Sequence, residues 1–331
     1  MDLVDQFKQK AKDQVRTVVY PEGEDERILT AAATAVSEGI ARAIVVGKKE
    51  AIEETAERLN LDLASITIAD PKTSDKLDEY AALYVKNRPD MSESVARRLV
   101  RKRLAFGGMV VASGDADAMV AGAASATASV LQSAAMTIGF GPGITTASSF
   151  FIMVVPEFLG EKDKIFVFAD CAVNVQPTAQ QLAEIAVSTG RSTRSLLGME
   201  PKVAMLSFAS KGSASHDDAD KVIEALEMAR ELDSSFEIDG ELQADAAIVP
   251  RVAAKKVKDS PVAGQANVLV FPDLDSGNIS YKLTQYLAGA TALGPILQGF
   301  AKPCSDLSRG ATAEDIISTT AITAALVQNA E

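Results

Sequence analysis

A polar turn near the carboxyl end of the chain carries the densest set of chemically useful side chains. Residues 306–310 read DLSRG and lead into residues 312–315 and then an apolar stretch, the pattern of a helix that begins directly after a turn. The N–H groups of a first helical turn and the helix dipole favour an anion, and an arginine adds paired, charge-assisted hydrogen bonds. The sequence therefore indicates phosphate binding by Arg309. A second interpretation stays open for Asp315, because Thr312 with an acid three residues later also has the spacing of a capping box.

Other catalytic patterns are weak in this sequence. A Ser-His-Asp triad would have to use His216, the only histidine, and its polar neighbours before a helix are typical of capping. Proton transfer would then fall to a carboxylate. The sequence has no HExxH motif, cysteine cluster or EF-hand spacing, so we expect no required metal ligand. The glycine run 139–143 is neither GxGxxG nor a Walker loop, so an NAD site of that type is unsupported.

Composition and charge limit the class of protein. A chain of 331 residues with 47% apolar residues can bury a large core and is long enough for two domains. A formal net charge of -12 disfavours binding to nucleic acid or to anionic membranes, because both need a positive field. Cys171 and Cys304 lie far apart, which predicts neither a disulfide framework nor a zinc cluster. The first 14 residues lack the apolar centre of a signal peptide, so we expect a cytoplasmic protein.

The elements that must position these side chains follow an α/β pattern. Short β-branched runs alternate with longer amphipathic stretches, which indicates a parallel sheet whose strands are buried on both faces. We expect strands at residues 17–20, 43–46, 165–169, 203–208, 246–249, 268–271 and 295–297. We expect helices at residues 24–38, 49–59, 92–104, 178–197, 217–232, 276–287 and 312–327.

Two features suggest how the chain is divided. No charge lies between Asp117 and Glu157, but this stretch is rich in small residues and is broken by glycines, so we interpret it as two buried helices around a hinge and not as a membrane span. Breaks near residues 156–160 and 294–295 then predict a first domain of residues 1–154 and 295–331, with a second domain of residues 155–294 inserted into it. In parallel sheets ligands bind beyond the carboxyl ends of the strands, which again singles out the turn at residues 299–310.

Several strings together resemble the phosphotransacetylase (phosphate acetyltransferase) family. Their order and spacing agree with that family over nearly the whole chain. The strings are FADCA at 168–172, VAMLSF at 203–208, KGSA at 211–214, DGELQ at 239–243, FP at 271–272 with GNI at 277–279, GPILQG at 294–299, and DLSRG at 306–310 followed by Asp315.

The resemblance implies a fold, an assembly and a reaction. It implies a two-domain fold like that of isocitrate and isopropylmalate dehydrogenases, with the active site in the interdomain cleft, and a homodimer. It implies reversible transfer of an acetyl group between coenzyme A and inorganic phosphate, by direct attack of the thiol on acetyl phosphate in a ternary complex. Coenzyme A is then a substrate, and no prosthetic cofactor is expected.

The resemblance also assigns roles to the residues of the polar turn. A free thiol has a pKa of about 8.5, so a nearby base should help to form the thiolate, and Asp315 is the candidate base. Arg309 would hold the phosphoryl oxygens. Ser308 would donate a hydrogen bond to the charge that develops at the carbonyl, a contribution of about 3 kcal/mol for a preorganised donor.

Other positions match the family with less agreement. Arg88 corresponds to an arginine that binds coenzyme A. Residues 125–132 read SATASVLQ where the family reads close to HSTADxxR, so Gln132 replaces a cation. We expect a weaker coenzyme A site, or a relocated one at which Arg97, Arg101 or Lys102 of the basic run at 97–103 supplies the charge. Hydroxyls of the same segment remain available to substrate, from Ser125, Thr127 and Ser129. Cys171 and Lys211 are expected near the site without a catalytic role.

Alternatives to an acetyl group and to catalysis stay open. The acyl group could be propionyl or butyryl, since pocket volume cannot be derived from these strings. A noncatalytic acyl-coenzyme A sensing module is favoured by Gln132 and disfavoured by the intact Ser308, Arg309 and Asp315. A decarboxylating dehydrogenase of the same fold is disfavoured, because no nucleotide fingerprint or metal carboxylate cluster is present.

Overall fold

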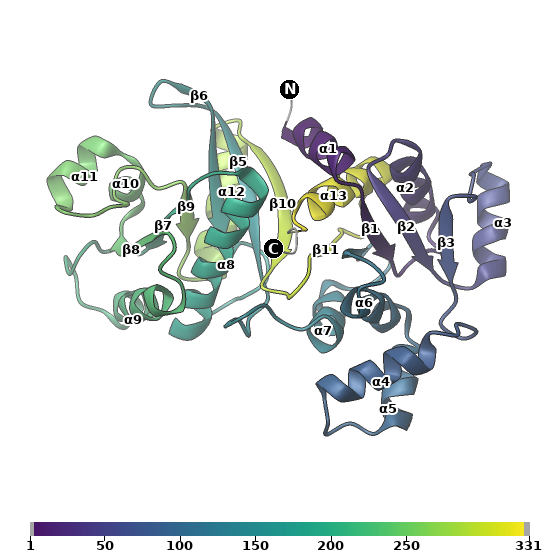
Figure 1. Cartoon of the computed structure of the whole chain (residues 1–331). Coiled ribbons are helices and arrows are strands. Elements are labelled where there is room, and N and C mark those ends of the chain that lie inside the picture. Colours follow the sequence, from purple (N-terminus) through teal and green to yellow (C-terminus); the bar gives the residue numbers. More distant parts are fainter. Residues whose placement is uncertain (1–2, 328–331) are drawn as a thin grey trace. The chain divides into compact units, whose positions relative to one another are not determined.

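The computed structural model describes residues 3–327, and Figure 1 shows the course of the chain. The chain forms two compact units: unit 1 comprises Met1–Phe140 and Phe300–Glu331, and unit 2 comprises Gly141–Gly299. The sequence predicts boundaries after residue 154 and before residue 295, but these positions fall inside strands β5 (Ser148–Phe158) and β10 (Thr291–Gln298). Because β5 and β10 are hydrogen-bonded to each other along both strands, neither can be divided between units.

Unit 1 is built on a five-stranded sheet in the order β11-β4-β1-β2-β3, in which all neighbouring strands are parallel. Its strands are β1 (Arg16–Tyr20), β2 (Ala41–Val46), β3 (Ile66–Ala69), β4 (Ala118–Ala121) and β11 (Cys304–Asp306). Val18, Val19 and Tyr20 are fully buried although successive side chains point to opposite faces. Both faces of the sheet are therefore covered, as is usual for parallel sheets.

The helices of unit 1 come from both ends of the sequence. They are α1 (Leu3–Asp13), α2 (Glu26–Ser37), α3 (Lys49–Leu59), α4 (Leu77–Asn87), α5 (Glu93–Val100), α6 (Arg103–Ser113), α7 (Thr127–Thr137) and α13 (Ala313–Ala325). Helix α13 packs against α1 and α2 (Figure 1). The Tyr20 hydroxyl is 3.0 Å from Oγ1 of Thr320, which joins β1 to α13. The turn that precedes α13 is thereby held at the same sheet as the N-terminal strands.

Unit 2 is built on a six-stranded sheet in the order β10-β5-β6-β9-β7-β8. Besides β5 and β10, its strands are β6 (Glu161–Ala169), β7 (Lys202–Leu206), β8 (Glu237–Leu242) and β9 (Val268–Val270). Its helices are α8 (Ala179–Leu197), α9 (Asp217–Leu232), α10 (Ala244–Ile248), α11 (Pro250–Lys256) and α12 (Leu274–Leu287). The pairs β6·β9, β9·β7 and β7·β8 are parallel, whereas β10·β5 and β5·β6 are antiparallel. The parallel sheet expected from the sequence is therefore confirmed for unit 1 and is mixed in unit 2.

The expectation of two buried helices between Asp117 and Glu157 is wrong. This stretch contains strand β4, helix α7 and most of strand β5. Residues 118–121 and 148–153 are buried throughout, so both faces of these strands are covered and their side chains do not alternate between buried and exposed. A short apolar run of this kind cannot be assigned to a helix or to a strand by periodicity alone.

Two further predictions of secondary structure need correction. The sequence predicts a strand at residues 246–249, but helix α10 covers Ala246 and Ala247, which are buried in the hydrophobic core of unit 2. The helix expected at residues 92–104 is two helices, α5 and α6, which are separated by Arg101 and Lys102. Across residues 3–327, no helix combines the length and apolar character needed to cross a membrane.

Candidate active site

The carboxyl ends of β1, β4 and β11 are neighbours at one edge of the sheet in unit 1. The chain proceeds from β1 to β2 and β3 on one side, whereas β4 and β11 lie on the other side of β1. The direction of the chain across the sheet therefore reverses between β1 and β4, and ligands of open parallel sheets bind beyond the carboxyl ends of the strands at such a point. The loops at this edge contain Glu22 after β1, residues 122–126 after β4 and residues 307–312 after β11.

Ser308 and Arg309 lie exposed on the loop between β11 and α13. The Ser308 carbonyl accepts a hydrogen bond from Ala311 N at 2.9 Å, and Ser308 Oγ accepts one from Gly310 N at 3.2 Å. Among residues 3–327 the Arg309 guanidinium has no hydrogen-bond or ion-pair partner, although its carbonyl is bonded. No described residue therefore competes with an anion for this guanidinium.

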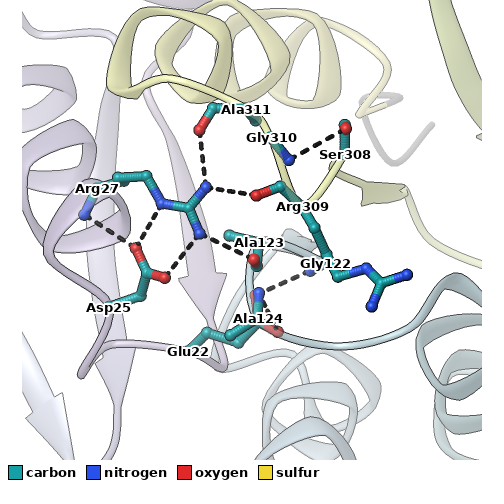
Figure 2. A network of polar contacts seen from close by, with 10 residues as sticks. All are labelled: Glu22, Asp25, Arg27, Gly122, Ala123, Ala124, Ser308, Arg309, Gly310 and Ala311. Atoms are coloured by element: carbon teal, nitrogen blue, oxygen red, sulfur yellow. Dashed lines mark hydrogen bonds and ion pairs between the residues drawn. The ribbon is translucent and has the colours of Figure 1, made fainter.

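A second arginine, Arg27 at the start of α2, binds the backbone of this loop. Its Nη1 donates to the carbonyls of Arg309 at 2.7 Å and Ala311 at 3.0 Å, and its Nη2 donates to the carbonyl of Ala123 at 2.9 Å. Asp25 holds the same guanidinium through Nε at 3.1 Å and Nη2 at 2.8 Å, and these hydrogen bonds lower the pKa of Asp25. Figure 2 shows the Arg27 guanidinium between Asp25 and these carbonyls, with the Arg309 side chain directed away from it.

Glu22 holds the loop after β4 by accepting hydrogen bonds from backbone N–H groups of that loop. Its Oε2 accepts a hydrogen bond from Gly122 N at 2.9 Å and its Oε1 accepts one from Ala124 N at 3.2 Å (Figure 2). The Glu22 side chain is buried, so these N–H donors replace water around the carboxylate. Glu22 and Arg27 together fix the same loop, one through its N–H groups and the other through a carbonyl.

Asp306, the last residue of β11, is a second carboxylate at this edge and is half-buried. Its Oδ2 accepts a hydrogen bond from Thr127 Oγ1 at 2.6 Å, whereas its Oδ1 is buried and has no partner among the described residues. Burial raises the pKa of Asp306 to about 6, the Thr127 hydrogen bond lowers it, and the charge of Glu22 raises it further. A Cβ on Gly122, whose φ is +112°, would lie 2.3 Å from Asp306 Oδ1, so only glycine fits there.

Asp315 makes the capping interactions that its spacing allows. Its Oδ2 accepts hydrogen bonds from Thr312 N and Thr312 Oγ1, both at 2.8 Å, and Thr312 Oγ1 accepts one from Asp315 N at 3.2 Å. The capping interpretation is therefore confirmed. It leaves Oδ1 of this exposed side chain without a partner among residues 3–327, so capping does not prevent proton transfer.

The candidate substrate residues after β4 lie around the start of α7. Ser125 is half-buried in the preceding loop, and Thr127, Ser129 and Gln132 are exposed on the helix. Ser129 and Gln132 are three residues apart and share a helix face. The N-cap residue Ala126 provides no side-chain cap, which leaves N–H groups of the first turn available to an acceptor.

Arg88 is engaged with protein in this structure. It follows α4 and donates from Nε to the Met136 carbonyl at 3.2 Å and from Nη2 to the Ala135 carbonyl at 3.0 Å. Both carbonyls belong to the last turn of α7, where a cation stabilises the helix. The basic run is also partly paired, because Arg97 lies 3.1 Å from Asp78 and Arg103 lies 3.0 Å from Glu24.

Cys171 and Lys211 belong to unit 2. The Cys171 side chain is fully buried, and burial raises the pKa of its thiol, so it is a poor nucleophile. Lys211 Nζ donates at 2.6 Å to Oδ1 of Asp239 and at 2.6 Å to the Gly240 carbonyl, which commits it to a structural ion pair. The histidine His216 caps helix α9, since its Nδ1 accepts a hydrogen bond from Asp218 N at 3.1 Å.

The family is decided by comparison with known proteins. A family model described as phosphate acetyl/butaryl transferase matches residues 2–324. The chain belongs to this family. Its members transfer acyl groups, so the chain is an enzyme of the transferase class. In the described part of the chain, no group of three or more His, Cys, Asp or Glu residues is arranged to hold a metal ion.

Relatives in the phosphate acetyl/butaryl transferase family match nearly the whole chain. A phosphate acetyltransferase of Acetivibrio thermocellus is 46% identical over 330 residues, with 99% of each chain covered. One from Bacillus subtilis is 42% identical, with 98% of each chain covered. Among solved structures, a phosphotransacetylase from Streptococcus pyogenes has a TM-score of 0.89 at 43% identity, covering 98% of this chain and 97% of that one. The EutD phosphotransacetylase from Staphylococcus aureus has a TM-score of 0.88 at 42% identity, with coverage of 99% and 98%.

Three residues at the carboxyl edge of the unit 1 sheet have roles that the sequence did not predict. Glu22 lies in the turn after the strand predicted at residues 17–20, a place where ligands of parallel sheets bind, but its residue type and position alone assign it no role. Asp306 is part of the polar turn, but the burial of its Oδ1 follows from the close approach of Gly122. Nothing in the sequence distinguishes Arg27 from any other polar residue in the first turn of a helix.

Proposed function

We propose that this chain is a phosphate acetyltransferase, which converts acetyl-coenzyme A and phosphate into acetyl phosphate and coenzyme A and also catalyses the reverse reaction. One observation carries the proposal: Ser308 and Arg309 stand exposed on a loop whose backbone is anchored, with an Arg309 guanidinium that no described residue engages. The relatives named phosphate acetyltransferase at 42–46% identity support acetyl as the acyl group.

The proposed reaction proceeds without a covalent enzyme intermediate. In the direction of acetyl-coenzyme A synthesis, Asp315 accepts the thiol proton of coenzyme A, and the sulfur attacks the carbonyl carbon of acetyl phosphate. The bond between this carbon and the bridging oxygen then breaks, and phosphate leaves with the electron pair. Arg309 pairs with the phosphate oxygens, and Ser308 donates a hydrogen bond to the carbonyl oxygen as its negative charge develops.

Coenzyme A is proposed to bind as a substrate beside this loop, with no prosthetic cofactor required. The open N–H groups at the start of α7, together with Ser125, Thr127 and Ser129, provide hydrogen-bond partners for a polar ligand. Gln132 contributes no charge, so the exposed cations Arg101 and Lys102 are proposed to supply it, whereas Arg97 is paired with Asp78. A contact from Arg88 to coenzyme A would require it to exchange its bonds with the α7 carbonyls for bonds with the ligand.

We further propose a two-domain fold of the isocitrate dehydrogenase type and a cytoplasmic homodimer. The insertion of unit 2 in the sequence of unit 1 supports the fold proposal. An exposed apolar stripe on α12 supports the dimer, because such stripes usually mark protein interfaces. Its residues are Ile279, Leu283, Tyr286 and Leu287. Light scattering should report twice the chain mass for the wild type and the single chain mass for Leu287→Glu; a wild-type monomer would contradict the dimer.

The test of the function is phosphate-dependent release of free thiol from acetyl-, propionyl- and butyryl-coenzyme A. We expect turnover that is fastest with the acetyl substrate and that collapses in Asp315→Asn. Glu314→Gln is the matched control, since Glu314 is an exposed acid on the same helical turn, and it should keep wild-type turnover.

Two other outcomes would change the proposal. Faster turnover with propionyl- or butyryl-coenzyme A would replace the acetyl group and leave the reaction class intact. Binding of coenzyme A without turnover of any of the three substrates would identify a sensing module.

A further inference from the structure

Arg27 uses its whole hydrogen-bonding capacity at the candidate active site. A guanidinium has five N–H donors, and each of those in Arg27 has an acceptor. Two bonds go to the carboxylate of Asp25 and three go to backbone carbonyls, those of Ala123, Arg309 and Ala311. A guanidinium with no free donor is poorly placed to bind a substrate phosphate itself.

The three carbonyl partners of Arg27 are close in space but distant in the sequence. Ala123 is 96 positions away, Arg309 is 282 and Ala311 is 284. The first belongs to the loop after β4, and the other two belong to the loop that carries Ser308 and Arg309 (Figure 2). One planar fork therefore joins the two loops at the point where the chain reverses across the sheet.

The contrast with Arg58 on α3 shows that this arrangement is specific. Arg58 makes one ion pair, with Glu26 at 2.7 Å, and both side chains are more than half exposed. Exposed pairs of this kind contribute little to stability. The Arg27 side chain is 34% exposed and has an anchor, Asp25, that is 18% exposed. Asp25 also accepts a hydrogen bond from Arg27 N at 2.9 Å, which fixes the start of the side chain.

We propose that Arg27 is the positioning residue of the reaction: it aims Arg309 and Ser308 at the substrate by holding the carbonyls on both sides of Gly310. This inference rests on the proposed transferase function. The carbonyl of Arg309 and its side chain leave the same residue, so fixing the peptide restricts the directions that the guanidinium can take. A misplacement of about 1 Å in a positioned catalytic group can reduce the rate about 100-fold.

Lysine cannot take over this role. An ammonium is a compact point charge with three donors and no planar fork, so it cannot serve two loops and Asp25 in one geometry. Arg27→Lys keeps the positive charge near the site and removes the planar, five-donor fork. We expect kcat/KM for phosphate to fall about 100-fold in this variant, whereas KM for acetyl-coenzyme A stays within about twofold of the wild-type value.

The measurement is steady-state thiol release with phosphate and acetyl-coenzyme A varied in turn. Arg58→Lys is the matched control and should keep wild-type constants. Asp25→Asn is the second variant, because asparagine retains the helix cap and weakens the anchor of Arg27. We expect a smaller decrease in kcat/KM for phosphate than in Arg27→Lys, again with little change in KM for acetyl-coenzyme A. Thermal unfolding of each variant identifies any that fails to fold.

A double-mutant cycle distinguishes positioning from general support of the fold. If Arg27 acts through Arg309, adding Arg27→Lys to Arg309→Ala should lower kcat/KM for phosphate by less than about threefold, because the group that it aims is already absent. A full, multiplicative loss in the double variant would overturn the proposal, as would wild-type kinetics in Arg27→Lys. Absence of turnover in the wild type would instead contradict the proposed function.

Discussion

Asp306→Asn tests whether partial burial raises the pKa of a carboxylate beside the loop that carries Ser308 and Arg309. In the folded chain burial raises the pKa of Asp306 to about 6, against 3.8 for the free side chain. This difference corresponds to about 3 kcal/mol between the protonated and ionised states. Asparagine has nearly the same shape, accepts the Thr127 hydrogen bond through its carbonyl, and carries no charge at any pH.

The sign of the effect follows from proton linkage. Because the folded-state pKa is raised, the contribution of Asp306 to stability is fully present below the unfolded pKa near 4 and is lost as pH rises through about 6. The asparagine side chain would not undergo this loss. The free energy of unfolding of the variant, minus that of the wild type, should therefore increase by about 2.4 kcal/mol between pH 4 and pH 7.5, because a small part of the roughly 3 kcal/mol is already lost at pH 4. An amide left without an acceptor lowers the stability of the variant equally at every pH, so the slope is unaffected.

The assay is urea unfolding followed by circular dichroism at several pH values, with Asp90→Asn as control. Asp90 is exposed in the loop between α4 and α5. For Asp90→Asn the free energy of unfolding, minus that of the wild type, should not change with pH. A flat difference for Asp306→Asn as well would refute the reasoning, because Asp306 would then be ionised in the folded state at no cost.

Three further predictions concern the same chain. Gly122→Ala should destabilise it by about 2–4 kcal/mol in denaturant unfolding, because the new Cβ would lie 2.3 Å from Asp306 Oδ1 at a φ of +112°; an unchanged midpoint would show that the loop relaxes freely. Gln132→Arg should tighten coenzyme A binding about fivefold in calorimetry and make it more sensitive to salt, through a restored charge-assisted hydrogen bond. Cys171→Ala should keep kcat within about threefold, since a buried thiol with a raised pKa is inert; a larger loss would give Cys171 a role in the reaction.

Local sequence is sufficient where one element can be recognised by itself. The sequence predicts helix α3 with its observed bounds, Lys49–Leu59, because its apolar positions recur at helical spacing between polar faces. It also predicts the capping box of Thr312 and Asp315, because all of the interactions lie within three residues. Local sequence is insufficient for β4 and β5, whose uniform apolar runs have no period.

The sequence by itself determined the α/β class, the family and the polar turn with Ser308, Arg309 and Asp315, because these depend on residue type and on short spacings. The tertiary structure alone decided how that turn is held. Glu22 and Arg27 reach it or its neighbouring loop across about 100 to 280 positions of chain, through backbone groups that every residue possesses. A backbone carbonyl has no signature in the sequence, so the partner of a side chain that binds one is known only after folding brings the two together.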